Sequence, residues 1–386
     1  MNFKFHLNYR LLFLLVLLGG LAAREVALEL RPTFLRPGLH LFAYVGNTGD
    51  GTLTAIDIVK LAAVATIPVG AGPTGIRAHP TRKEIWGLSS AGGYAWVLDA
   101  NSDRIVARIP VGREPYALDF SPDGSRAYVA ASGSNSVVAI DCATRQIVAR
   151  GSAGRRPWIA RVSPDGKLLI VSNHDDSTIS ILDARTLSSL AVVKVAPRPE
   201  QIAILPDSSK AFVTSGSADQ VSVVDLKRKV LLTNLVLGGK PDDLILKPDG
   251  GELFIPSSQA HGLLIVNTQT NEVVQFLLLG MSPTDGALAP NRGILYVSDT
   301  AGGDVVPIMI DSRQIAHPIP VGQAPGTCAL TPGGDELLVV DAASDDLAVI
   351  RTRTPGPEEN TLAPPPGPIT LIPLGSSPRD LAIKLF

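Results

Sequence analysis

Short apolar runs alternate with turn-forming residues along most of this chain, and the alternation repeats with a constant period. A representative unit contains four runs rich in β-branched and other apolar residues: Tyr116–Phe120, Ala127–Ala130, Ser136–Asp141 and Gln146–Ala149. A tight turn, Ser121-Pro122-Asp123-Gly124, separates the first two runs. Runs of this length bounded by such turns are typical of strands, so each unit predicts four β-strands.

A Gly-x-x-Pro marker opens every unit. The markers begin at Gly70, Gly112, Gly154, Ala196 (which replaces the glycine), Gly238, Gly280, Gly322 and Gly375. Six successive intervals are 42 residues long, and the last is 53. A period in the low forties that contains four strands matches one blade of a β-propeller. The unbroken repeat therefore predicts a single all-β ring rather than several domains.

The two ends of the repeat supply complementary parts of one blade. Only one strand, Arg379–Ile383, follows the last marker, whereas residues 41–69 provide three strands and lack the first. We therefore predict eight four-stranded blades, with the C-terminal strand completing the N-terminal blade and closing the ring. The last interval is 11 residues longer than the others. We assign this excess to a Pro-rich excursion between strands at residues 353–373.

The N-terminal residues depart from the repeat. Lys4 and Arg10 precede the apolar run Leu11–Leu18, and small residues follow it. This pattern predicts a signal peptide over residues 1–22, a lead segment over 23–40 and the propeller over 41–386. The alternative is that the segment stays uncleaved as a membrane anchor. We expect a periplasmic or extracellular protein with no further membrane span.

Composition and charge narrow the chemistry. The formal net charge is −2, so we expect no basic surface for nucleic acid. Cys142 and Cys328 fall in different units, which favours free thiols that fill apolar space over a disulfide. The chain contains no His or Cys spacing typical of zinc, no phosphate-binding Gly-Lys loop and no Gly-x-Ser-x-Gly motif. We therefore expect no metal and no cofactor.

Several second-strand motifs share a core close to Tyr-Val-x-Asn: Ala43–Asn47, Ala127–Ala130, Ile170–Asn173 and Leu295–Asp299. The chain resembles the YVTN-repeat β-propellers, which include the YncE-like exported proteins. This resemblance implies a propeller outside the cytoplasm from a family whose members mostly lack an assigned reaction. Related propellers include seven-bladed lactone hydrolases and eight-bladed haem- or quinone-binding enzymes. The YncE-like proteins usually have seven blades, so their surfaces are not carried over.

Positions that break the repeat are candidates for function. The two positions after each marker proline should enter the central channel. There, three consecutive units carry carboxylates and two neighbouring units carry aromatic rings. The residues that we select are Tyr116, Trp158, Glu200, Asp242, Asp243, Asp285, Arg379 and Asp380. Carboxylates clustered in a confined channel should raise one another's pKa, as acid–base and cation sites do. The alternative is that these side chains are simply solvated ends of the inner strands.

Two positions deeper, three adjacent units carry Arg77, Asp119 and Arg161 where the other five carry apolar residues. Charges on an inner strand need partners. The favoured interpretation is a structural ion-pair ladder between neighbouring blades. The alternative is an anion pocket in which Asp119 orients the two guanidiniums on a carboxylate or phosphate. We interpret His174, which precedes two Asp residues, as part of a solvated turn.

These observations favour a monomeric binding or scaffolding protein that recognises an envelope protein, a polysaccharide or a small molecule at the channel mouth. The main alternative is a lactone hydrolase that uses Asp243 or Asp285 as a general base. A haem- or quinone-binding propeller is a further alternative, favoured only by the blade count.

Overall fold

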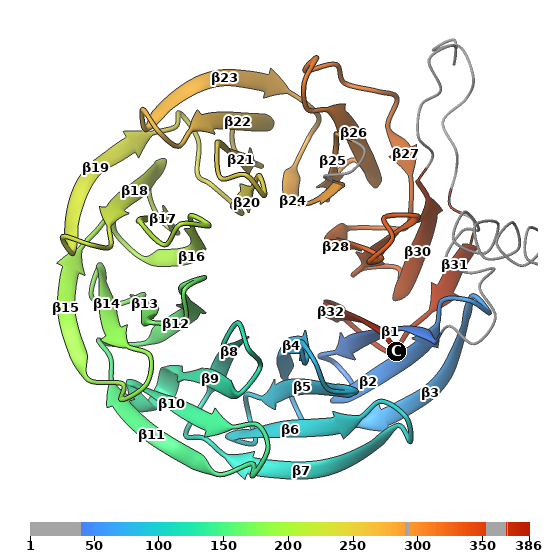
Figure 1. Ribbon diagram of the computed structural model, residues 1–386. Helices are drawn as coiled ribbons and strands as arrows, with labels where there is room; N and C mark the ends of the chain where they lie inside the picture. Colours follow the sequence, from blue (N-terminus) through green and yellow to red (C-terminus); the bar gives the residue numbers. More distant parts are fainter. Residues whose placement is uncertain (1–39, 290–292, 353–367, 369) are drawn as a thin grey trace, which may run out of the picture.

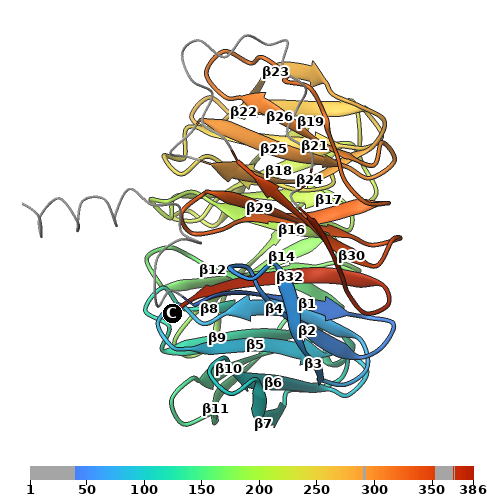
Figure 2. The ribbon, with the colours of Figure 1, turned by 90° about the vertical axis from the view of Figure 1, so that its right-hand side faces the viewer.

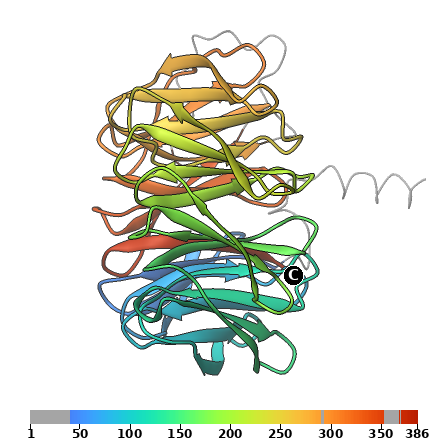
Figure 3. The ribbon, with the colours of Figure 1, turned by 90° about the vertical axis from the view of Figure 1, so that its left-hand side faces the viewer.

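The computed structural model describes residues 40–289, 293–352, 368 and 370–386. Eight four-stranded antiparallel sheets stand around a common axis, which confirms the predicted eight-bladed β-propeller (Figure 1). Edge-on views show a disc that is one blade thick (Figures 2 and 3). The described residues contain one short helical turn, the 3-10 helix Ser132–Ser134. None of their helices could cross a membrane.

Each blade runs from an inner strand near the axis to an outer strand at the rim. In this order, blade 1 consists of β32 (Pro378–Leu385), β1 (Leu41–Asn47), β2 (Thr52–Asp57) and β3 (Ala62–Pro68), and blade 2 of β4 (Pro73–Ala78), β5 (Glu84–Ser89), β6 (Tyr94–Asp99) and β7 (Arg104–Pro110). Blade 3 consists of β8 (Pro115–Phe120), β9 (Arg126–Ala131), β10 (Ser136–Asp141) and β11 (Ile147–Ser152), and blade 4 of β12 (Pro157–Val162), β13 (Leu168–Asn173), β14 (Thr178–Asp183) and β15 (Ser189–Lys194). Blade 5 consists of β16 (Pro199–Ile204), β17 (Lys210–Ser215), β18 (Gln220–Asp225) and β19 (Val230–Val236), and blade 6 of β20 (Ile245–Leu246), β21 (Glu252–Ser257), β22 (Gly262–Asn267) and β23 (Glu272–Leu278). Blade 7 consists of β24 (Pro283–Ala289), β25 (Ile294–Asp299), β26 (Asp304–Met309) and β27 (Ile319–Pro320), and blade 8 of β28 (Pro325–Leu330), β29 (Glu336–Asp341), β30 (Asp346–Arg351) and β31 (Thr370–Pro373).

The predicted closure of the ring is confirmed. The last strand, β32, pairs antiparallel with the first, β1, so that Ala43 lies opposite Ile383 and Tyr44 opposite Ala382. The backbone of His40 also exchanges two hydrogen bonds with that of Phe386, at 3.1 and 2.9 Å. Residues from the two ends of the described chain therefore share one sheet.

The core lies between neighbouring blades. All six residues of β5 are buried, whereas six of the seven residues of β23 are exposed. Tyr44 and Ala382 of blade 1 pack against Ile76 and Trp96 of blade 2 in one cluster. Burying a large apolar side chain stabilises the fold by roughly 1.5–3 kcal/mol. Middle and inner strands therefore together hold each blade to the next.

In blades 1 and 4 an asparagine ends the second strand and organises the mouth side of the blade. In blade 4, the side-chain amide of Asn173 donates to Thr178 and Ser180, and its oxygen accepts the amide of the marker Gly154. In blade 1, Asn47 donates in the same way to two threonines. The Asn of the Tyr-Val-x-Asn motif thus ties the second strand to the third.

Blade 8 places an acid at this position. Asp341 is fully buried and accepts the amide of Gly322 at 3.0 Å. It also shares a hydrogen bond with Asp346, at a position where blades 1 and 4 have a hydroxyl. Burial and this second carboxyl raise the pKa of Asp341 to about 8. In blade 8, a proton shared between Asp341 and Asp346 therefore takes the place of the hydrogen bond that the asparagine side-chain amide donates in blades 1 and 4.

Three predictions concern segments at or beyond the limits of the described residues. The signal peptide, residues 1–22, lies outside them, as does the lead segment except for His40. Most of the Pro-rich excursion at 353–373 also lies outside. Its last residues, Thr370–Pro373, form β31, the outer strand of blade 8. The excursion therefore ends before residue 370, because this segment is needed to complete the four-stranded sheet.

Candidate functional site

Two adjacent cavities lie along the axis. The outer one has a volume of about 490 Å³ at the marker-proline end, and its lining includes Thr74, Tyr116, Arg379 and Asp380. The inner one has a volume of about 680 Å³, and its lining includes Arg77, Arg161, Asp242, Asp243 and Asp285. Gly326, Thr327 and Asp380 line both. The two cavities are therefore adjacent, and each has a size that holds small molecules.

Two arginines project into the inner cavity from inner strands of blades 2 and 4. Arg77 donates to the carbonyl oxygen of Ile76 at 3.0 Å, and Arg161 donates weakly to that of Ala160 at 3.5 Å. Burial and the positive charge of Arg77 lower the pKa of Arg161, although Asp119 and Asp243 oppose the shift. Neither arginine, within the described part of the chain, lies at salt-bridge distance from a carboxylate.

The predicted ion-pair ladder is therefore not formed. Asp119, which lies between the two arginines in the repeat, accepts the backbone amide of Val162 at 2.9 Å. The Asp119 carboxylate thus links blade 3 to a backbone amide of blade 4 instead of bonding a guanidinium. The repeat could show that the three charges are neighbours, but it could not show which group Asp119 would bond.

Asp243 and Asp285, from blades 6 and 7, form a hydrogen-bonded carboxyl pair at the inner cavity. Burial raises the pKa of both, and the negative charge of Asp243 raises that of Asp285 further, well above its ordinary value. The two carboxyls share a hydrogen bond, and the positive charge of Arg161 acts to lower the pKa of Asp243. Within the predicted acidic arc, Asp243 thus raises the pKa of Asp285 and Asp242 raises that of Asp243, whereas the hydrogen bond with Asp285 lowers the pKa of Asp243, so the elevation within this pair is not mutual.

The other two members of the arc make different contacts. Asp242 lines the same cavity and accepts the amide of Ser258 at 2.6 Å. Glu200 does not line either cavity; its carboxylate lies 3.7 Å from the imidazole of His174. The arc predicted from the repeat is therefore split. Three carboxylates face the channel, and the fourth belongs to a polar network beside the mouth.

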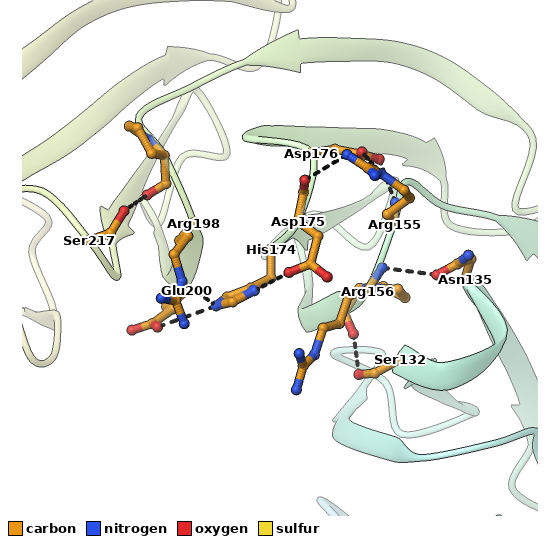
Figure 4. A network of polar contacts seen from close by, with 12 residues as sticks. Ser132, Asn135, Arg155, Arg156, His174, Asp175, Asp176, Arg198, Glu200 and Ser217 are labelled. Carbon is orange, nitrogen blue, oxygen red and sulfur yellow. Dashed lines mark hydrogen bonds and ion pairs between the residues drawn. The ribbon is translucent and has the colours of Figure 1, made fainter.

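Figure 4 shows this network around His174, which sequence reasoning interpreted as solvated. The structure corrects that interpretation, because the residue is only 5% exposed. Its Nδ1 lies 2.6 Å from the carboxylate of Asp175, and its Nε2 accepts Nε–H of Arg198 at 3.1 Å. Both ring nitrogens are therefore engaged. No feature of a single His followed by two acids would have revealed this arrangement.

An aromatic stack borders the mouth on this side. The rings of Tyr116 and Trp158 lie 3.7 Å apart between centroids, and Trp158 stacks on His174 at 5.3 Å. The guanidinium of Arg156 lies over Trp158 at 5.5 Å. Burial and the nearby charge of Asp380 raise the pKa of Tyr116. We call Tyr116, Trp158 and His174 the aromatic shelf.

Most of the predicted site residues thus meet around one space. Tyr116, Arg379 and Asp380 line its mouth, and Arg77, Arg161, Asp242, Asp243 and Asp285 line its interior. Trp158 and Glu200 stand beside it in the shelf and its network, and Asp119 is bonded to backbone. Which of these residues contact a ligand stays a prediction.

Metal ligands and reactive thiols are scarce in this part of the chain. The described residues contain no group of three or more His, Cys, Asp and Glu side chains that could hold a metal ion. Cys142 and Cys328 are free and buried. Cys328 lines the inner cavity, where burial and the two acids raise the pKa of its thiol well above the ordinary value.

Comparisons with known proteins support a β-propeller. The family described as Cytochrome D1 heme domain matches residues 87–235, which is less than half of the chain. No curated protein matches the sequence. The resemblance to YVTN-repeat proteins is not among these findings and stays a prediction.

Solved structures share the fold at low identity. A dihydro-heme d1 dehydrogenase, NirN, aligns with a TM-score of 0.73 and 16% identity, over 88% of this chain and 74% of that one. Apo AztD from Citrobacter koseri aligns at 0.66 and 12%, over 90% and 98%. The hydrazine synthase of Kuenenia stuttgartiensis aligns at 0.60 and 19%, over 73% and 96%.

Proposed function

We propose that this protein binds a small molecule that carries a carboxylate, which enters at the marker-proline mouth and reaches the inner cavity. The observation that supports this function is the pair Arg77 and Arg161, which face one cavity without a carboxylate at salt-bridge distance among the described residues. An unpaired charge in a confined space is costly. A ligand carboxylate held between two guanidiniums would remove this cost and add charge-assisted hydrogen bonds.

The shape of the site favours a small ligand over a macromolecular partner. The inner and outer cavities are adjacent and concave, and the aromatic shelf stands at the outer one. Aromatic rings beside a polar pocket suit the apolar or unsaturated part of a small molecule. Together with the predicted signal peptide, these features support a ligand-binding propeller that acts outside the cytoplasm.

The family match raises the question of haem. Iron in haem proteins is held by His, Met, Tyr or a Cys thiolate. Among the described residues, neither cavity is lined by His or Met, and Cys328 keeps its proton because burial raises its pKa. Tyr116 is stacked on Trp158, and both nitrogens of the nearby His174 are engaged. These side chains do not fit a haem held through its iron, and we derive no function through it.

Binding can be tested by isothermal titration calorimetry of the full chain with acetate, butyrate, succinate and benzoate. We expect at least one of these carboxylates to bind, and Arg161→Gln to weaken it at least tenfold. The matched control is Arg150→Gln, because Arg150 is exposed on the outer strand β11. Unchanged binding in the Arg161 variant would contradict the proposal, as would the absence of any binding.

A lactone hydrolase is the second candidate, supported by the hydrogen-bonded pair Asp243 and Asp285. Ionised Asp243 could take a proton from water while the water oxygen attacks the lactone carbonyl carbon. Protonated Asp285 could donate to the carbonyl oxygen. As the bond from the carbonyl carbon to the ring oxygen breaks, Asp243 would pass the proton taken from water to the ring oxygen, and the re-forming carbonyl would return its proton to Asp285, which gives the hydroxy acid. Arg161 beside Asp243 would stabilise the developing negative charge.

This candidate requires turnover rather than binding. A pH-stat assay over a panel of lactones, with the Asp243→Asn/Asp285→Asn double variant beside the wild type, measures it directly. Hydrolysis that vanishes in the double variant would establish an enzyme with its site in the inner cavity. No turnover across the panel would leave the binding function alone.

A further inference from the structure

The channel holds unpaired charges of both signs. Asp380 and Asp242 each bond a backbone amide through Oδ2 at 2.6 Å, donated by Gly75 and Ser258 respectively. Each keeps a second oxygen, and neither lies at salt-bridge distance from a cation in the described part of the chain. All four side chains, Asp242, Asp380, Arg77 and Arg161, line the inner cavity, and Asp380 also lines the outer one.

The buried arginines and the two acids come from different blades. Arg77 and Arg161 stand on β4 and β12, in blades 2 and 4, whereas Asp242 comes from the segment before β20, in blade 6, and Asp380 from β32, in blade 1 (Figure 1). Arg379, beside Asp380 on β32, lines the mouth cavity but not the inner one. A ligand with only a carboxylate would satisfy Arg77 and Arg161 but would add negative charge to a space that already contains Asp242 and Asp380.

An aromatic ring adjoins one of the free carboxylates. Tyr116 lines the mouth cavity together with Asp380, and the charge of Asp380 contributes to the raised pKa of its phenol. A carboxylate beside the face of an aromatic ring is a favourable place for an ammonium or quaternary ammonium group. The mouth therefore offers a cation position, and the inner cavity offers the anion position.

Resting on the proposed carboxylate-binding function, we propose that the ligand is a zwitterion of the amino-acid or betaine class. Its carboxylate pairs with Arg77 and Arg161, and its cationic nitrogen is held by Asp380 and Tyr116, with Asp242 facing the same space. Such a ligand neutralises both sets of charges at once. It also explains why the repeat is broken by both basic and acidic residues around one channel.

Calorimetry with matched ligand pairs tests this proposal. The pairs are 4-aminobutyrate against butyrate, γ-butyrobetaine against butyrate, and glycine betaine against acetate. For at least one pair, we expect the zwitterion to bind the wild-type chain at least tenfold more tightly than the acid. Asp380→Asn keeps an oxygen for the amide of Gly75, so it should abolish this preference while butyrate or acetate still binds. Glu272→Gln, on the exposed rim strand β23, is the control and should retain the preference.

The outcomes separate the two proposals. If the acids bind as tightly as the zwitterions in every pair, the zwitterion inference is wrong and the carboxylate-binding function stands. If neither class binds the wild type, both are wrong. If Asp380→Asn does not fold, as judged by circular dichroism, Asp242→Asn replaces it, and an unchanged preference in that variant contradicts the inference.

Discussion

Replacing Asp341 by asparagine should stabilise blade 8 and remove a pH dependence that the acid creates. The folded protein keeps the proton of Asp341 up to about pH 8, whereas a carboxyl with its ordinary pKa of 3.8 releases it far earlier. The stability contributed by the protonated form is complete below about pH 4 and is lost as the pH rises towards 8. Each pH unit in this window lowers the free energy of unfolding by about 1.4 kcal/mol.

At pH 7 the accumulated loss reaches up to about 4 kcal/mol. The side-chain amide introduced by Asp341→Asn would not ionise, and its oxygen could still accept the backbone amide of Gly322, which bonds Asp341 at 3.0 Å. Its NH₂ group could donate to Asp346, as Asn173 donates to Thr178 in blade 4. The variant therefore restores the arrangement of the repeat at this position.

Urea unfolding followed by circular dichroism at pH 4.5, 6, 7 and 8.5 measures the effect. The difference in free energy between D341N and wild type should be near zero at pH 4.5 and grow to several kcal/mol at pH 8.5. The converse variant, Asn47→Asp, serves as a control, because it places an acid at the same position of blade 1 and should destabilise more as the pH rises. A difference that is constant with pH, or a less stable D341N at pH 8.5, would refute the shared-proton argument.

Three further changes test other parts of the molecule. Deleting Arg379–Phe386 removes most of β32 from blade 1 and should sharply lower the melting temperature; an unchanged thermal melt would contradict closure. Gly87→Ala would bring a Cβ atom to 2.2 Å from the ring of the buried Trp96, so we expect a loss of about 1–3 kcal/mol in urea unfolding, and no loss would mean that the ring can move freely. Trp158→Ala removes the partner of Tyr116 in the aromatic shelf, so carboxylate binding should weaken several-fold in calorimetry while the circular dichroism spectrum stays the same; equal binding would exclude a role for the shelf.

The sequence predicted the fold well because each blade repeats the same pattern of strands and turns at a constant spacing along the chain. The markers and turns set the strand count of each blade, and the incomplete units at the two ends predicted the pairing of β32 with β1. Backbone geometry of this kind follows from Gly, Pro and β-branched residues at fixed spacing. The one segment misplaced was Thr370–Pro373, because its short apolar run lies next to a Pro-rich stretch and resembles a loop.

The site was predicted less completely, because the repeat gives the position of a side chain and not its bonding partner. The sequence identified Arg77 and Arg161 as candidate site residues. It did not show that Asp119 would accept the backbone amide of Val162, because this bond depends on where β12 places Val162. Glu200 and His174 are far apart in the repeat pattern, and their contact crosses from one blade to the next. Contacts between blades depend on side-chain length and rotamer, which a single sequence does not reveal.

The pairing of β32 with β1 also sets the order in which this protein can mature. During translation the first three strands of blade 1 are made before the other seven blades, whereas their inner neighbour, β32, is made after them. A nascent chain that already carries seven complete sheets still exposes the inner edge of β1. The final strand must then find a partner more than 300 residues away in sequence, and contacts of such long range slow folding. Until that moment the chain depends on staying unaggregated, since open edges invite pairing with other chains.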